Sequence, residues 1–200
     1  MSSDSEQRTI NLAILASGNG SNAETIVRHF EVHPFIKVKL ILSNRPDAMV
    51  LHRASKLDVP SMVFTREDFY ESDRVVKLLQ NMQIDWVILA GFLWLVPDNL
   101  LKAYPNKIIN LHPALLPKYG GKGMYGANVH KAVLAAKEKQ SGITIHLLND
   151  RFDEGPILFQ ATCEVSEKDT PETLAYRIHS LEYEHFPFVI ERTIHASLGK

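Results

Sequence analysis

The segment INLAILASGNGSNAETIVRHF, residues 10–30, decides the fold. Its first seven residues, 10–16, are apolar except for Asn11 and predict a buried strand, and residues 22–30 have the spacing of an amphipathic helix. Between them lies the turn Ser17-Gly18-Asn19-Gly20-Ser21-Asn22, which is rich in glycine and small polar residues. A strand that is apolar on both faces needs helices on both sides, so this segment predicts the first unit of a parallel α/β sheet.

The same alternation continues along the chain. Apolar runs at 36–42, 61–64 and 85–91 predict strands, and residues 47–57 and 68–82 predict the helices that separate them. The second half predicts a short helix at 97–104, a strand at 107–111, a helix at 128–137, strands at 143–148 and 156–165, and a closing helix from 171 to about 196. Only a short loop separates the last two strands, so we expect them to pair antiparallel. The expected fold is one α/β domain over residues 1–200, with a doubly wound, mostly parallel sheet, an antiparallel C-terminal strand pair and a flexible tail at 1–8.

Composition narrows the partners of the protein. Lys plus Arg number 22 against 23 Asp plus Glu, so no basic excess favours a nucleic-acid partner. The only cysteine, Cys163, excludes an internal disulfide framework and fits a reducing compartment. The polar start of the chain is unlike a signal peptide, and no apolar run reaches bilayer-spanning length, so we expect a cytoplasmic protein without a membrane partner.

The turn at 17–22 has the features of a phosphate-binding site. It joins a strand to the start of a helix, where free backbone N–H groups and the positive helix end favour an anion. Two alternatives remain open at this point. The pattern Gly18-x-Gly20-x-x-Ala23 also fits a dinucleotide-binding fingerprint, although the ribose-binding acid expected after the second strand is replaced by Ser43-Asn44-Arg45. The pattern Ser21-x-x-Glu24 could instead be a capping box that needs no ligand.

Asn110 and His112 are the candidate catalytic pair. They are two residues apart on a predicted strand, so both side chains project from the same face. An amide donor beside an imidazole suits acyl transfer, because one can stabilise an oxyanion while the other moves a proton. The alternative is that the histidine is a hydrogen-bonded structural group. The remaining histidines that we considered show no paired metal-ligand spacing, so no metal site is expected: His29, His33, His52, His130, His179, His185 and His195.

Three segments together resemble the folate-dependent glycinamide ribonucleotide formyltransferases. They are the turn at 17–22, the run Val87-Ile88-Leu89-Ala90-Gly91-Phe92 with the later segment 109–119 (INLHPALLPKY), and residues 142–156. The resemblance spans nearly the whole chain. It implies a Rossmann-like formyltransferase fold and formyl transfer from 10-formyltetrahydrofolate to the amine of glycinamide ribonucleotide, in a monomer or weak homodimer with no metal.

The resemblance also implies roles for individual residues. Asn110, His112 and Asp153 would be catalytic, with Asp153 supporting His112. The ribonucleotide would be bound by the backbone of Gly20, Ser21 and Asn22, together with His179 and Glu182. The folate would contact Leu93, Trp94, Leu95, Val96, Asn110, Asn149, Asp150, Arg151, Phe152 and Asp153.

The sequence departs from the family pattern in three places. Trp94 stands where many members carry Arg, and Asn149 stands where many carry Thr. The glycine-rich segment 118–126 predicts a mobile flap over the site, since four glycines in nine positions add backbone entropy. The rival functions are formyltetrahydrofolate hydrolysis, methionyl-tRNA formyl transfer and a nucleotide-binding module without catalysis.

Overall fold

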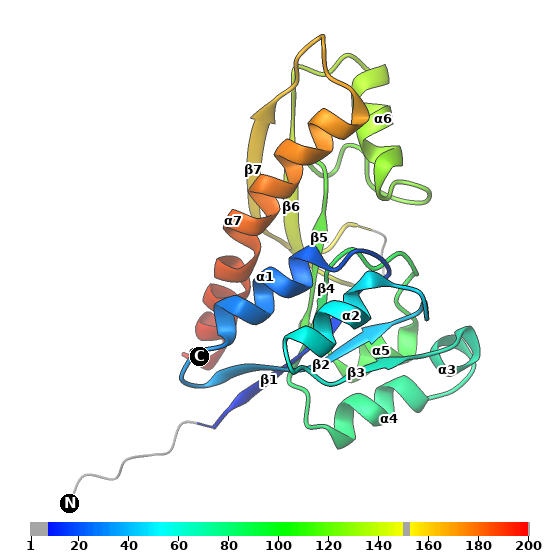
Figure 1. The fold of residues 1–200 in the computed structure, drawn as a ribbon, viewed down its shortest axis with the longest axis vertical. Coiled ribbons are helices and arrows are strands. Elements are labelled where there is room, and N and C mark those ends of the chain that lie inside the picture. The colour runs from blue at the N-terminus through cyan, green and yellow to red at the C-terminus, as the bar shows by residue number, and fades with distance from the viewer. Residues whose placement is uncertain (1–7, 150–152, 200) are drawn as a thin grey trace, which may run out of the picture.

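A computed structural model describes residues 8–149 and 153–199, which contain one seven-stranded sheet in the order β3-β2-β1-β4-β5-β6-β7 (Figure 1). The predicted tail at 1–8 lies outside the described residues except for Arg8, which pairs with Asp85. The strands are β1 (Ile10–Leu15), β2 (Ile36–Ser43), β3 (Ser61–Val63), β4 (Trp86–Leu89), β5 (Ile108–His112), β6 (Gln140–Leu147) and β7 (Ile157–Glu164). The helices are α1 (Ser21–Phe30), α2 (Met49–Lys56), α3 (Arg66–Tyr70), α4 (Arg74–Asn81), α5 (Asp98–Ala103), α6 (Ala127–Ala135) and α7 (Pro171–Leu198).

The strand pairing confirms the predicted topology. The strands from β3 through β5 pair in parallel, whereas β6 is antiparallel to both β5 and β7. The chain first builds outward from β1 through β2 to β3 and then returns to place β4 on the other side of β1. This reversal opens a crevice beyond the carboxyl ends of β1 and β4, which is where doubly wound sheets bind ligands.

Helices cover both faces of the sheet, as the near-continuous apolar strands require. Alternate residues of β1 enter two different hydrophobic clusters: Leu12 and Ile14 face one side, and Ala13 and Leu15 face the other. The first cluster also contains core residues of α1, α2, α6 and α7, and the second contains those of α3, α4 and α5. Figure 1 shows α1 and α7 side by side on one face, with α3, α4 and α5 below and behind the strands.

One predicted helix is wrong, because residues 68–82 form two helices. Thr65 caps α3 earlier than expected, through a capping box with Asp68. The side chain of Asn99 then donates hydrogen bonds to the Ser72 carbonyl and to the Asp73 carboxylate. The Ser72 carbonyl thus has a partner outside the helix, and this arrangement marks the break before α4 begins at Arg74.

The closing helix α7 is 28 residues long and links two distant parts of the protein. It begins at a capping box made by Thr170 and Thr173, and its buried side includes Glu182 at mid-length. Its last turns carry Glu191 and His195, which lie beside the C-terminal end of α1. No helix in the described part of the chain is both long enough and apolar enough to cross a membrane.

Candidate active site

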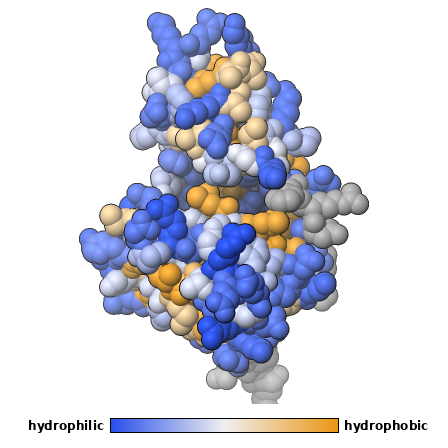
Figure 2. Space-filling view, turned by 90° about the vertical axis from the view of Figure 1, so that its right-hand side faces the viewer, coloured by the Kyte–Doolittle hydropathy of each residue, from blue (hydrophilic) through white to orange (hydrophobic). Residues whose placement is uncertain are grey.

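A cavity of about 590 Å³ lies at the carboxyl ends of β4 and β5, between the start of α1, the segment 121–126, α6 and α7. Figure 2 looks onto this side of the molecule and shows a hollow at its waist where hydrophobic side chains gather. The cavity is lined by every predicted site residue that the structure describes: Gly20, Ser21, Asn22, Leu93, Trp94, Leu95, Val96, Asn110, His112, Asn149, Asp153, His179 and Glu182. Three predicted folate contacts, Asp150, Arg151 and Phe152, lie outside the described residues.

The turn before α1 leaves the helix N-terminus open to the cavity. Gly20 is the N-cap residue with φ +77°, and a Cβ at this position would lie 2.4–2.7 Å from atoms of Val50. Only glycine fits here, because of both the close approach of α2 and the left-handed backbone. The helix has no side-chain cap, so the capping-box alternative is wrong. Glu24 instead binds Arg28 and Arg53, which lower the pKa of its carboxyl group.

The residues after β2 stabilise this turn. The Ser17 hydroxyl donates a hydrogen bond to the Asn44 side-chain oxygen at 2.7 Å and accepts one from the Leu93 backbone N–H at 2.9 Å. Asn44 therefore occupies the region where a dinucleotide-binding protein presents its ribose-binding acid, and it is already engaged within the protein. The geometry favours a phosphate site over a dinucleotide site.

Glu182 and His179 of α7 form the wall opposite this turn. The Asn22 side chain donates a hydrogen bond to Glu182 Oε2 at 2.8 Å. Glu182 is only 5% exposed, and burial raises its pKa to about 7 in spite of this hydrogen bond. Burial also lowers the pKa of His179, whose ring stacks on Tyr183. A buried carboxylate with one amide donor has unused acceptor capacity, which suits a hydroxyl-bearing ligand.

Asn110 is oriented by a histidine that the sequence analysis missed. His146 on β6 lies opposite Asn110 in the antiparallel pair with β5. Its Nδ1 is 3.1 Å from the Leu147 carbonyl, so Nδ1 carries the proton and Nε2 accepts a hydrogen bond from Asn110 Nδ2 at 3.0 Å. Burial lowers the pKa of His146 and thereby favours this neutral form. The second N–H of the Asn110 amide is left as a donor for a ligand, and the β5–β6 register was the signal that could have located His146.

His112 has a similarly fixed ring. Its Nε2 lies 2.8 Å from the Tyr119 carbonyl and must donate to it, so the neutral ring carries its lone pair on Nδ1. That Nδ1 is 3.9 Å from Asp153 Oδ2. The separation is too long for a direct hydrogen bond. The neutral His112 is thus oriented as a proton acceptor beside a carboxylate.

Asp153 connects the acidic loop to the glycine-rich segment. Its Oδ2 accepts a hydrogen bond from the Gly121 backbone N–H at 2.8 Å, and its Oδ1 is 3.7 Å from His146 Nε2. A Cβ at Gly120 would lie 3.3 Å from the Asp153 Cβ and 2.7 Å from Leu116 Cδ2, so a larger residue here would force these side chains to shift. These bonds anchor residues 119–121, and the flap at 118–126 stays a prediction.

The segment after β4 offers an apolar wall on the other side of Asn110. The side chains of Leu93 and Leu95 are 44% and 50% exposed, whereas Val96 is buried. Trp94 packs within an aromatic cluster with Phe64, Phe69 and Tyr70, and the Arg66 guanidinium lies over its ring. Exposed leucines beside open polar groups are suited to a flat aromatic ligand.

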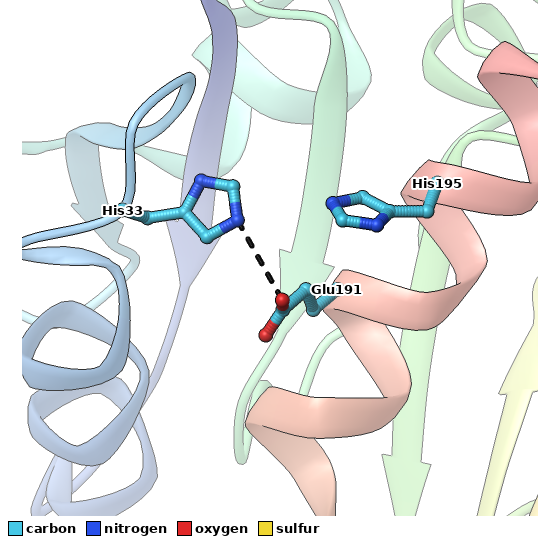
Figure 3. A group of neighbouring side chains, drawn as sticks. All are labelled: His33, Glu191 and His195. Carbon is cyan, nitrogen blue, oxygen red and sulfur yellow. Dashed lines mark ion pairs between the residues drawn. The ribbon is translucent and has the colours of Figure 1, made fainter.

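A second group of histidines lies outside the cavity. His33, Glu191 and His195 place one ligand atom each within 4.8 Å of one another, a spacing that a metal ion could use (Figure 3). However, His33 Nδ1 accepts hydrogen bonds from the backbone N–H groups of Ile36 and Phe35, at 2.9 and 3.3 Å. The neutral ring therefore presents an N–H, and not a lone pair, to Glu191 at 3.6 Å. This tautomer opposes metal binding, and the hydrogen bond that links α1 to α7 here joins His29 Nε2 and Glu191 Oε2 at 2.6 Å.

The doubly wound sheet and the polar groups at its switch point define an α/β enzyme of the group-transfer type. Residues 10–190 match the family described as formyl transferase, and the chain belongs to this family.

Comparisons with individual proteins agree with this assignment. The chain is 40% identical over 193 residues to a chloroplastic phosphoribosylglycinamide formyltransferase of Arabidopsis thaliana, covering 94% of this chain and 65% of that protein. It is 35% identical to the phosphoribosylglycinamide formyltransferase of Bacillus subtilis, covering 91% of this chain and 93% of the relative. The crystal structure of glycinamide ribonucleotide transformylase 1 from Symbiobacterium toebii superposes with a TM-score of 0.83 at 34% identity, covering 91% and 86% of the two chains.

Proposed function

We propose that this protein transfers the formyl group of 10-formyltetrahydrofolate to the amine of glycinamide ribonucleotide, a step of purine biosynthesis. The observation that carries the proposal is the pair of fixed polar groups in the cavity. Asn110 retains one unused N–H, and His112 offers its Nδ1 lone pair. Both residues line the same cavity as the open N-terminus of α1. A donor for an oxyanion and a proton acceptor, next to a phosphate-binding turn, suit acyl transfer to a phosphorylated amine.

The reaction would proceed by attack of the substrate amine on the formyl carbon. The oxygen of the resulting tetrahedral species would be stabilised by the Asn110 N–H and by His112 once it is protonated. Asp153 would favour the protonated ring and keep it oriented, and the proton would then pass to the departing folate nitrogen. The route needs no covalent intermediate, so positioning and electrostatics would supply the acceleration.

The two substrates would enter from opposite ends of the cavity. The backbone N–H groups of Gly20, Ser21 and Asn22 would bind the phosphate, and Glu182 with Asn22 would accept hydrogen bonds from ribose hydroxyls. The pterin ring would lie against Leu93, Leu95 and the segment from Asn149 to Asp153. We propose that the protein acts in the cytoplasm as a monomer or weak homodimer, without a metal, nucleic-acid or membrane partner.

A folate-absorbance assay with glycinamide ribonucleotide first present and then withheld tests this function. We expect tetrahydrofolate to form only when the amine substrate is present, with formylated ribonucleotide as the second product. Equal rates with and without the amine would show hydrolysis of formyltetrahydrofolate and would overturn the proposal. Binding of both ligands without turnover would favour a nucleotide-binding module.

A further inference from the structure

His130 of α6 is a buried residue that no feature of the fold explains. It is only 4% exposed, yet neither of its ring nitrogens makes a hydrogen bond within the described part of the chain, and Nδ1 is fully buried. Burial and the nearby His179 lower its pKa to about 4, so the ring is neutral near pH 7. A buried imidazole without partners reduces stability by the desolvation of its polar atoms. Such a residue is retained where it has another use.

The position of His130 indicates that use. It lines the cavity together with the turn at 18–22, His179 and Glu182. At this end of the cavity, the unpaired Asn22 Oδ1 is a hydrogen-bond acceptor and cannot donate. The same is true of the Glu182 carboxylate when it is ionised. They suit the hydroxyl groups of a ribose and would repel a phosphate. Among the cavity side chains, the imidazoles of His130 and His179 can donate a hydrogen bond to phosphate oxygens and can also gain a positive charge beside them.

We propose that His130, on the helix facing the backbone turn, is a substrate-positioning residue that binds the phosphate of a phosphomonoester ligand together with His179. The phosphate would contact the N–H groups of α1 on one side and imidazole N–H groups on the other. Ligand binding would then give the ring a hydrogen-bond partner at Nε2, the ring nitrogen that is not fully buried. The inference rests on the proposed function for the identity of the substrate, but phosphate binding can be tested without the reaction.

The test compares His130→Leu with the wild-type protein. Leucine fills a similar volume and removes both polar atoms, so the ligand-free variant should melt about 2–4 °C higher, as expected for removing one unsatisfied buried group. Its affinities for inorganic phosphate and glycinamide ribonucleotide, measured by calorimetry, should fall about ten- to hundredfold, as expected for losing a hydrogen bond to a charged group. Affinities for the dephosphorylated riboside and for the folate should stay within about twofold of wild type, because neither ligand carries the phosphate.

Two further variants make the outcome decisive. His130→Gln keeps an N–H donor and should lose less than about fivefold in phosphate affinity, because the donor is retained. His52→Leu changes an exposed histidine on α2 that does not line the cavity, and should leave both melting temperature and affinity unchanged.

If His130→Leu lowers the melting temperature and weakens the binding of both substrates alike, His130 is structural and the proposal is wrong. The same holds if phosphate affinity is unchanged, or if His130→Gln loses as much as His130→Leu. A protein that binds phosphate through His130 but fails to transfer formyl groups would overturn the proposed function and leave this inference intact.

Discussion

Residues 8–149 and 153–199 contain two clusters in which histidines surround one carboxylate, and only the first of these lies at the cavity. In the first, His112 Nδ1 and His146 Nε2 lie 3.9 and 3.7 Å from Asp153. In the second, His29 and His33 lie 2.6 and 3.6 Å from Glu191, in a region packed with aromatic rings. The second cluster has the shorter contacts, but Asp153, His112 and Asn110 share a cavity with the start of α1. Close pairing of histidine and carboxylate therefore does not identify a catalytic site.

Hydrogen bonds to the backbone distinguish the two clusters. His112 donates Nε2–H to a carbonyl and keeps its Nδ1 lone pair on the side of Asp153. His33 accepts backbone N–H groups at Nδ1 and therefore presents Nε2–H to Glu191. The first arrangement leaves a base beside a carboxylate, whereas the second completes a donor-acceptor pair. The same residue types thus support chemistry in one place and cohesion between helices in the other.

The largest expected effect is the loss of kcat in Asp153→Asn, and the same carboxylate-to-amide change in the second cluster serves as its control. Asp153→Asn should lower kcat by about 10²–10⁴, because a proton-transfer group would lose the charge that favours its protonated form. The ribonucleotide KM and the melting temperature should stay close to wild type, since Asn can still accept the Gly121 hydrogen bond. Steady-state kinetics with both substrates measures the split.

Glu191→Gln is the matched control. It should leave kcat within about twofold of wild type and lower the melting temperature by about 2–4 °C, the loss of one partly buried pair. Asp150→Asn, a nearby change in the acidic loop, should also affect kcat far less than Asp153→Asn. If either control proves more damaging to kcat than Asp153→Asn, the catalytic acid has been wrongly assigned.

The opposite effect on stability is expected at a third carboxylate, Glu182, which is buried. Glu182 lacks a cationic partner among the described residues, and burial raises its pKa to about 7, above the usual value of 4.5. Its raised pKa means that the folded protein binds this proton more tightly than the unfolded chain. The stability contributed by the protonated form is therefore present below pH 4.5 and is lost as pH rises towards 7.

Glu182→Gln should accordingly stabilise the ligand-free protein at pH 8 by up to about 3 kcal/mol, because each pKa unit corresponds to about 1.36 kcal/mol. At pH 4 the gain should vanish, and the ribonucleotide KM should rise at both pH values if the carboxylate binds ribose hydroxyls. Thermal melts at the two pH values provide the measurement. Equal stabilisation at pH 4 and pH 8 would show that ionisation of Glu182 is not its cause.

The sequence predicted the sheet better than it predicted the helices and side-chain networks. The positions of the strands and the mostly parallel sheet followed from apolar runs separated by helical segments, since crossover helices join parallel strands. The break between α3 and α4 was missed because it depends on Asn99, which is distant in the sequence and bonds to Ser72 and Asp73. Local periodicity carries no information about such a long-range contact.

The candidate site was predicted in the same uneven way. Asn110 and His112 were identified from their two-residue spacing and Asp153 from resemblance, and all three line one cavity. The role of His146 depends on the register between β5 and β6, and that of His130 on the packing of α6 against α7. The tautomers of His112 and His33 depend on single carbonyl and N–H groups of the folded backbone, so residue identity alone could not separate the two clusters.

The smallest expected effect is the response of the second cluster to zinc, which would be bound by His33, Glu191 and the neighbouring His195. A zinc ion requires a lone pair on each histidine ligand, and metal-bound histidines usually donate their other N–H to an oxygen. His33 could offer Nε2 to a metal only if Nδ1 were protonated, which would break its hydrogen bonds from Ile36 and Phe35. Zinc in modest excess should therefore change the melting temperature by less than about 1 °C through this cluster, since little net stabilisation by mass action is available.

The measurement compares thermal melts of wild type, His33→Gln and Glu191→Gln with zinc and with a chelator. A zinc-dependent rise of several degrees in wild type that both variants abolish would show that the cluster binds metal and that the assigned His33 tautomer is wrong. A rise that persists in both variants would place the ion elsewhere and leave the assignment standing.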